Sequence, residues 1–258
     1  MRTANGISYS ESGSKDSGVG RYPLILIHGA GGSSLHWPTE VRRLQDHWVL
    51  SIDLPGHGES EGPGQATIEG YVEQLRAWLD ALAIERAVWV GHSMGGGISL
   101  TAALTIPERV AGLVLVGTGG RLRVHPSILE ATAQPESFRG AVDLIISWAF
   151  SPQAPSNLTQ LAAKRMVETQ PMVLHNDFKA CDSFDVMSRL EEIRAPAIAI
   201  CGREDKLTPP RYSEVLAQHI VDASLKLIDN AGHMVMLEKP AEVAQAIQSF
   251  TSQLMAED

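Results

Sequence analysis

The chain has 258 residues, a net charge of −9, 44% hydrophobic residues and only 2 cysteines. Its length and apolar fraction fit a single globular domain with a large core, and its negative charge argues against binding to nucleic acid or to an anionic membrane surface. The N-terminal residues lack the apolar core of a signal peptide, and no apolar run approaches the roughly 20 residues of a membrane span, so we expect a cytoplasmic protein.

Short apolar runs bounded by glycine and polar residues recur along the first half of the chain and predict buried strands. They cover residues 7–10, 24–27, 49–52, 87–90 and 112–117. A polar loop is expected at residues 13–20. Before the fourth run, apolar side chains recur every three or four positions, which predicts an amphipathic helix over residues 68–83 that packs on the sheet.

The segment 120–184 interrupts this rhythm with helical patterns and several prolines. Apolar positions within 138–149 and within 158–167 predict two helices. We interpret the segment as a helical cap over the edge of the sheet. The alternative is an ordinary packing layer of helices without substrate contact.

Strand-like runs return in the last part of the chain. Residues 195–202 and 224–228 predict two more strands, and Pro240 is expected to open a final helix. The chain therefore divides into a core formed by residues 1–119 and 185–258 and an inserted cap formed by residues 120–184.

The pentapeptide Gly91-His92-Ser93-Met94-Gly95 fits the pattern G-x-S-x-G between a predicted strand and a predicted helix. A serine on such a sharp turn has its hydroxyl exposed above the sheet, and the glycines avoid clashes with neighbouring backbone. The turn also places backbone N–H groups at a helix N-terminus, where they can hold a negative oxygen. These features describe an activated nucleophile at Ser93.

A serine hydroxyl needs a base, and the base needs an orienting acid. Asp205 and His233 both follow predicted strands, as Ser93 does. In an open parallel sheet the carboxyl ends of the strands share one edge, where ligands bind. The chain order of serine, aspartate and histidine is the order of the α/β-hydrolases.

The chain resembles the α/β-hydrolase superfamily, in its small capped form, over nearly its whole length. Five segments carry the resemblance in the correct order: the pentapeptide around Ser93, residues 28–32 (HGAGG), residues 53–60 (DLPGHGES), residues 202–209 (GREDKLTP) and Gly232-His233. The resemblance implies an α/β-hydrolase fold, with a mostly parallel central sheet, helices on both faces and a helical cap. It also places the acid at Asp205 rather than at its neighbour Glu204.

The resemblance further implies a serine hydrolase that cleaves carboxylic esters of short to medium acyl chains through an acyl-enzyme, without cofactor or metal. The N–H groups of Met94 and Ala30 would form the oxyanion hole. A lactonase, a C–C bond hydrolase and a perhydrolase remain alternatives on the same triad. A ligand receptor with slow turnover is the alternative from another class. The expected partner is a small-molecule ester, and the protein would be a monomer or a homodimer.

Several other residues could be mistaken for catalytic groups. We interpret His57 as structural and His92 as a residue that packs beneath the serine turn. His36 and Trp37, which follow residues 28–32, are candidates for the edge of the pocket. We expect His125 and His175 to lie on the surface or rim of the cap. Cys181 and Cys201 are expected to be reduced core thiols. No clustered metal ligands and no dinucleotide-binding pattern occur in the sequence.

Overall fold

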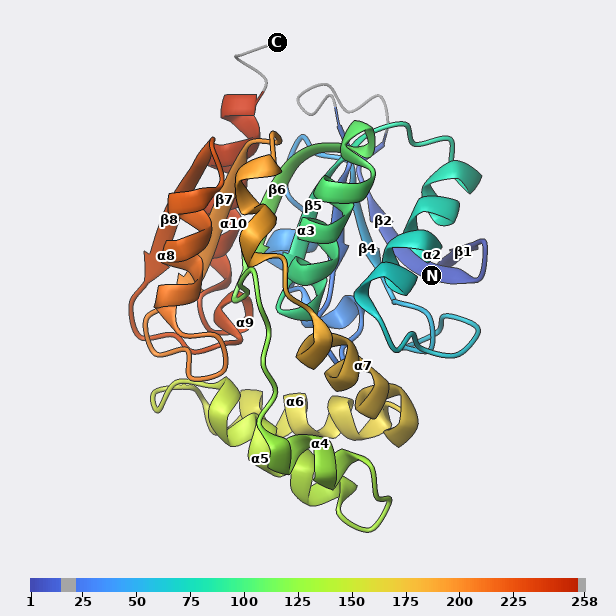
Figure 1. Ribbon diagram of the computed structural model, residues 1–258, viewed down its shortest axis with the longest axis vertical. Helices are drawn as coiled ribbons and strands as arrows, with labels where there is room; N and C mark the ends of the chain where they lie inside the picture. The colour runs from blue at the N-terminus through green and yellow to red at the C-terminus, as the bar shows by residue number, and fades with distance from the viewer. Residues whose placement is uncertain (15–21, 255–258) are drawn as a thin grey trace.

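The structure, a computed structural model, describes residues 1–14 and 22–254. Across these residues eight strands form one sheet in the order β1-β2-β4-β3-β5-β6-β7-β8 (Figure 1). The strands are β1 (Arg2–Ala4), β2 (Ile7–Ser12), β3 (Leu24–Ile27), β4 (Val49–Ile52), β5 (Ala87–His92), β6 (Val110–Val116), β7 (Ala197–Gly202) and β8 (Ala223–Ile228). Strands β3 to β8 run parallel, and β2 pairs antiparallel with β1 and β4. The expected mostly parallel sheet is confirmed.

Helices cover both faces of the sheet, which explains the continuous apolar runs of the central strands. On β3, Ile25 and Ile27 pack into the core on one face, while Leu24 and Leu26 pack into the core on the other. The first face is covered by α2 (Ile68–Ala81), α3 (Met94–Thr105) and α8 (Pro210–His219), and the second by α1 (Thr39–Arg42) and α10 (Pro240–Leu254).

The residues with an amphipathic pattern after residue 67 form helix α2. The side chain of Thr67 caps the helix by accepting a hydrogen bond of 3.1 Å from the N–H of Gly70. The expected helix over residues 68–83 ends slightly earlier, at Ala81. Ala83 has a positive φ of 50°, which is incompatible with continuing a right-handed helix.

Four α-helices lie between β6 and β7 in the described chain: α4 (Pro126–Thr132), α5 (Phe138–Ala149), α6 (Ser156–Glu168) and α7 (Pro171–Ser183). They lie together beyond the carboxyl ends of the parallel strands, at the bottom of Figure 1. The two connections to the core run side by side, since Arg121 and Asp185 form an antiparallel bridge and the N–H of Val186 donates to the carbonyl of Gly120 at 2.7 Å. The two helices predicted in this segment are present as α5 and α6.

Short elements complete the described chain. They are the 3-10 helices η1 (Ser34–His36), η2 (Pro107–Arg109) and η3 (Met187–Glu192), and the one-turn helix α9 (Val235–Glu238). Most of the polar loop expected at residues 13–20 lies outside the described residues. Among the helices of the described chain, none is long and apolar enough to span a membrane.

Candidate active site

Ser93 occupies the turn between β5 and α3, with φ 53° and ψ −115°. A non-glycine residue in this region of backbone space is strained and needs support from its surroundings. The N–H of Ser93 donates to the carbonyl of Val116 at 2.9 Å, and the hydroxyl of Thr118 donates to the carbonyl of Ser93 at 2.8 Å. A side chain at Gly95 would overlap the carbonyl oxygen of Ile27. The turn is thus held in the sharp form that the sequence pattern predicts.

The ring of His233 faces Asp205. Nδ1 of His233 lies 2.9 Å from Oδ2 of Asp205, and both side chains are almost fully buried. A carboxylate accepts but does not donate, so Nδ1 carries the ring proton and Nε2 is left free to act as a base. The histidine therefore faces Asp205 and not Glu204, as the resemblance implies.

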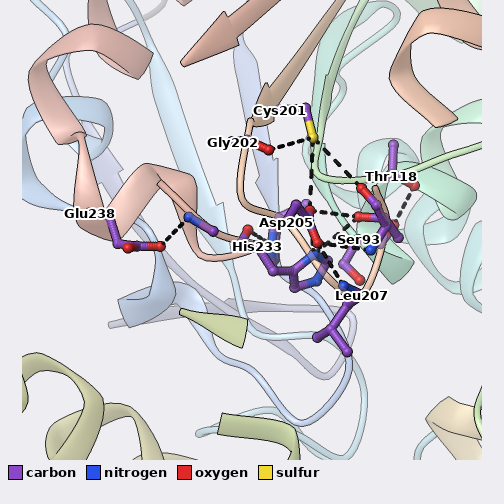
Figure 2. A network of polar contacts seen from close by, with 11 residues as sticks. Ser93, Thr118, Cys201, Gly202, Asp205, Leu207, His233 and Glu238 are labelled. Atoms are coloured by element: carbon purple, nitrogen blue, oxygen red, sulfur yellow. Dashed lines mark hydrogen bonds and ion pairs between the residues drawn. The ribbon is translucent and has the colours of Figure 1, made fainter. Parts of the chain in front are cut away.

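The carboxylate of Asp205 is held by two backbone N–H groups and one hydroxyl, and the Sγ of Cys201 also lies 3.9 Å from its Oδ2 (Figure 2). Its Oδ1 accepts from the backbone N–H groups of Leu207 at 2.9 Å and Thr208 at 2.8 Å, and its Oδ2 accepts from the hydroxyl of Thr208 at 2.8 Å. The same hydroxyl oxygen lies 3.1 Å from Nδ1 of His233. Thr208 is not predictable from the sequence, because a threonine in a loop has no pattern that distinguishes it.

The loop that carries His233 is held by Glu238 at the end of α9. One carboxylate oxygen of Glu238 accepts from the N–H of Gly232 at 2.8 Å, and the other accepts from the N–H of Ser151, just after α5, at 3.0 Å. The N–H of Met234 also donates to the carbonyl of Ala149 at 3.0 Å. The histidine loop is therefore attached to the helical insertion.

His92 packs beneath the serine turn and contacts the second half of the site. Its ring centroid lies 4.7 Å from that of His233, and its Nε2 lies 3.1 Å from the carbonyl oxygen of His233. Burial, followed by repulsion from His233, holds the pKa of His92 well below its usual value. The ring is neutral and donates through Nε2, which confirms the interpretation as a packing residue.

The loop of residues 28–32 lies against the serine. A Cβ placed on Gly29 would be 3.1 Å from the Cβ of Ser93. Nδ1 of His28 donates to the carbonyl of Gly29 at 2.8 Å, and Nε2 accepts from the N–H of Leu54 at 3.0 Å. Burial lowers the pKa of His28 far below its usual value, in agreement with a neutral ring. Ala30 and Ser93 line the same cavity.

The cavity has a volume of about 550 Å³, and His233 also lines it. Some of its lining residues belong to the core, and many others belong to the segment 120–184. Those from the segment are Leu122, Arg123, Val124, His125, Ile128, Ile145, Ile146, Trp148, Ala149, Ala162, Met166, Phe178 and Cys181. Ser93 and His233 therefore share a concave site with a mainly apolar lining, as is typical of binding sites for small molecules.

The secondary candidates lie at different places. His36 and His125 line the cavity, whereas Trp37 is fully buried in the core. His175 is partly buried, and its Nδ1 lies 3.2 Å from the hydroxyl of Thr132. His57 lies deeper, in a buried polar cluster with Asp177 of α7.

Both cysteines are free and buried. Burial, followed by the charge of Asp205, raises the pKa of the Cys201 thiol to about 12, and burial likewise raises the pKa of Cys181. Neither thiol is activated as a nucleophile. In the part of the chain that is described, no group of three or more His, Cys, Asp or Glu side chains could hold a metal ion.

Comparison with known proteins agrees with this geometry. The family model described as the alpha/beta hydrolase fold matches residues 22–240. A curated relative from Salmonella newport (strain SL254), pimeloyl-(acyl-carrier protein) methyl ester esterase, is 27% identical, with the match covering 92% of this chain and 96% of the relative.

Solved structures match the fold as well. A thermophilic esterase is 33% identical, with a TM-score of 0.83 and coverage of 96% of this chain and 94% of that chain. The enol-lactonase from Burkholderia xenovorans LB400 is 25% identical, with a TM-score of 0.87 and coverage of 96% and 97%.

Proposed function

This chain belongs to the α/β-hydrolase fold family and is a hydrolase of the esterase type, and we propose that it cleaves carboxylic esters of short to medium acyl chains through Ser93, His233 and Asp205. One observation carries the proposal. A strained serine at the head of α3 and a histidine fixed by a buried carboxylate open into the same cavity. This combination of nucleophile, base and orienting acid is what acyl transfer requires.

In the first half of the reaction, Nε2 of His233 takes the proton of the Ser93 hydroxyl as Oγ attacks the ester carbonyl. Asp205 keeps the proton of the ring on Nδ1 and stabilises the imidazolium that forms. The tetrahedral intermediate then collapses. Its bond to the alcohol oxygen breaks, and that oxygen takes the proton from His233, which leaves the acyl group on Ser93.

In the second half, His233 takes a proton from water as the water oxygen attacks the acyl-enzyme. The second intermediate collapses with release of the carboxylic acid, and the proton returns to the oxygen of Ser93. The proton thus moves only between the substrate, the water, Ser93 and His233. The proposed reaction needs no metal and no organic cofactor.

We assign the oxyanion hole to the N–H groups of Met94 and Ala30. Met94 is the first residue of α3, where a backbone N–H has no acceptor within the helix. Ala30 lies on the loop next to Ser93. Loss of one such donor costs about 3 kcal/mol of transition-state stabilisation.

Residues 120–184 act in this proposal as a cap that shapes the acyl site, while residues 1–119 and 185–258 form the core. The apolar side chains that this segment contributes to the cavity support the assignment. We further propose that the partner is a small-molecule ester, that the protein acts as a monomer or homodimer in the cytoplasm, and that it binds neither nucleic acid nor membranes.

Steady-state hydrolysis of p-nitrophenyl esters with acyl chains from acetate to octanoate tests the proposal. We expect many turnovers per molecule of enzyme, and a specificity constant that rises with acyl length until the cavity is filled and then falls. A release of p-nitrophenol that stops at one equivalent would instead identify a slow ligand receptor.

Lactone hydrolysis is a second candidate, because the enol-lactonase structure matches almost the whole chain at 25% identity. The same triad can open a cyclic ester, with the alcohol remaining part of the product. A direct comparison of δ-valerolactone with methyl pentanoate separates the two. A specificity constant at least tenfold higher for the lactone would favour a lactonase over an esterase.

A further inference from the structure

Asp177, on α7 of the cap, is a fully buried carboxylate that contacts the loop next to Ser93. Its Oδ2 accepts a hydrogen bond of 2.8 Å from the backbone N–H of Gly31 and lies 2.8 Å from Nε2 of His57. Its Oδ1 accepts from the hydroxyl of Tyr71 at 2.6 Å. A side chain of the cap therefore binds the backbone of residues 28–32.

The buried carboxylate is paired with a positive charge. Both ring nitrogens of His57 face acceptors, Nδ1 the carbonyl of Pro55 at 3.1 Å and Nε2 the carboxylate of Asp177. Burial by itself lowers the pKa of His57, but the charge and hydrogen bond of Asp177 outweigh burial and raise it. An ionised pair in this place makes Asp177 a strong acceptor for the N–H of Gly31.

The cap holds the next peptide group of the same loop through Thr169, a residue between α6 and α7. The hydroxyl of Thr169 donates to the carbonyl of Gly31 at 3.1 Å. Gly31 has a positive φ of 62°, and a Cβ placed there would lie 2.6 Å from Cδ1 of Leu174. Both polar backbone groups of Gly31 are thus bound by the cap, which also covers the residue.

These contacts lead directly to the N–H of Ala30. Thr169 binds the carbonyl of Gly31, and the same peptide group carries the N–H of Gly32. That N–H donates to the carbonyl of Gly29 at 3.1 Å. The carbonyl of Gly29 and the N–H of Ala30 belong to one planar peptide group and point in opposite directions. The carbonyl of Gly29 also accepts from Nδ1 of His28 at 2.8 Å. These two donors together fix the carbonyl and therefore the direction of the N–H of Ala30.

We propose that the cap positions the oxyanion loop, with Asp177 and Thr169 as positioning residues that act through Gly31. This inference rests on the function proposed above, in which the N–H of Ala30 holds the oxyanion. The stretch of cap that carries these two residues also carries Met166 and Phe178, which line the cavity. Contact with the acyl chain and alignment of the oxyanion donor thus depend on the same part of the cap.

Thr169→Val is the most direct test, because it removes the hydroxyl and keeps the shape of the side chain. We expect kcat to fall about tenfold, less than the 10²–10³ that follows complete loss of an oxyanion donor. An alkyl boronic acid, which forms a tetrahedral adduct with the serine, should bind about tenfold more weakly. KM should change less than about twofold, because the N–H acts mainly on the negative oxygen that develops in the transition state. Thr169→Ser should restore the parent values.

The matched control is Thr132→Val. Thr132 is also a buried threonine of the cap, but its hydroxyl donates to the carbonyl of Ile128 within α4, at 2.8 Å. We expect thermal stability alone to change in this variant. Asp177→Leu should lower kcat about a hundredfold. Asp177→Asn should retain most of kcat, because the amide oxygen can still accept from the N–H of Gly31. The threonine variants keep the test decisive if Asp177→Leu does not fold.

The inference is overturned if Thr169→Val, like Thr132→Val, changes only the melting temperature. It is also overturned if kcat, KM and the inhibition constant of the boronic acid change by the same factor in Thr169→Val. The proposed function has a different mode of failure. If the parent shows no ester turnover that depends on Ser93 and no boronic acid binding, the proposed function and this inference both fall.

Discussion

Thr208 hydrogen-bonds to both carboxylate oxygens of Asp205, through its hydroxyl to Oδ2 and through its backbone N–H to Oδ1, each at 2.8 Å. The backbone donor persists in any variant, so the contribution of the hydroxyl can be isolated. Thr208→Val should lower kcat/KM about tenfold, or about 1.4 kcal/mol, because Asp205 then orients His233 less firmly. Thr208→Ser should behave as the parent does. Equal kcat/KM values for the valine variant and the parent would mean that the two backbone donors suffice.

The choice of Asp205 over Glu204 can be tested by a pair of amide variants. Asp205→Asn should fold normally and lose most turnover, because its amide can favour the wrong tautomer of His233. Glu204→Gln should retain parental kcat/KM, since the ring of His233 faces the neighbouring residue. The measurement is kcat/KM for ester hydrolysis and the melting temperature of each variant. The opposite ranking of activities would identify Glu204 as the orienting acid.

Trp148 and Phe150 allow the effect of the cavity wall to be separated from that of the core. Trp148 lines the cavity. Phe150 is buried in the core cluster on the face of the sheet that α1 and α10 cover, and it is absent from the cavity lining. Trp148→Ala should move the optimum of the ester series to longer acyl chains. Phe150→Ala should cost about 3–5 kcal/mol of stability without altering the ranking of esters. If neither substitution changes the ranking, the cap is a packing layer and not a substrate-shaping lid.

His36 makes stability depend on pH. Burial, followed by repulsion from Arg165, lowers its pKa from 6.5 to about 4. Above pH 6.5 the ring is neutral in both the folded and the unfolded chain. Below pH 6.5, the unfolded chain binds a proton at His36 that the folded chain does not bind. The free energy of unfolding therefore falls by up to about 1.4 kcal/mol for each pH unit of acidification. This loss ends near pH 4, where the ring also becomes protonated in the folded chain.

Denaturant unfolding of His36→Gln between pH 7 and 4 measures this contribution. We expect a smaller loss of stability on acidification than in the parent, with the remaining loss due in part to His28 and His92, whose pKa values are also lowered. His219→Gln, at an exposed position, serves as the control. If the variant and the parent had the same pH dependence, His36 would have the same pKa in the folded and the unfolded chain.

The positions of Ser93, Asp205 and His233 relative to the sheet could be predicted from the sequence because local signals mark them. Each follows an apolar run that forms a strand, and parallel strands bring their carboxyl ends to one edge. The helix α5 was predictable for a similar reason, since its apolar positions keep a helical spacing.

The buried cluster around Asp177 could not be predicted in this way. His57 was recognisable as structural, but Asp177 is 120 residues away in the sequence, and only the tertiary fold brings the two together. The same aspartate obscures helix α7, because a charged residue on its buried face interrupts the apolar stripe. Helix α4 is short, and strand β1 is mostly exposed, so neither has a strong periodic signal.

The central claim is that Ser93 is the nucleophile. A fluorophosphonate ester reacts with an activated serine by forming a P–O bond and releasing fluoride, and the adduct can be located by peptide mass spectrometry. We expect one equivalent of label, all of it on the peptide that contains Ser93, and no label on Ser93→Ala. A stoichiometric label on another residue, or an unlabelled parent that still hydrolyses esters, would contradict the account.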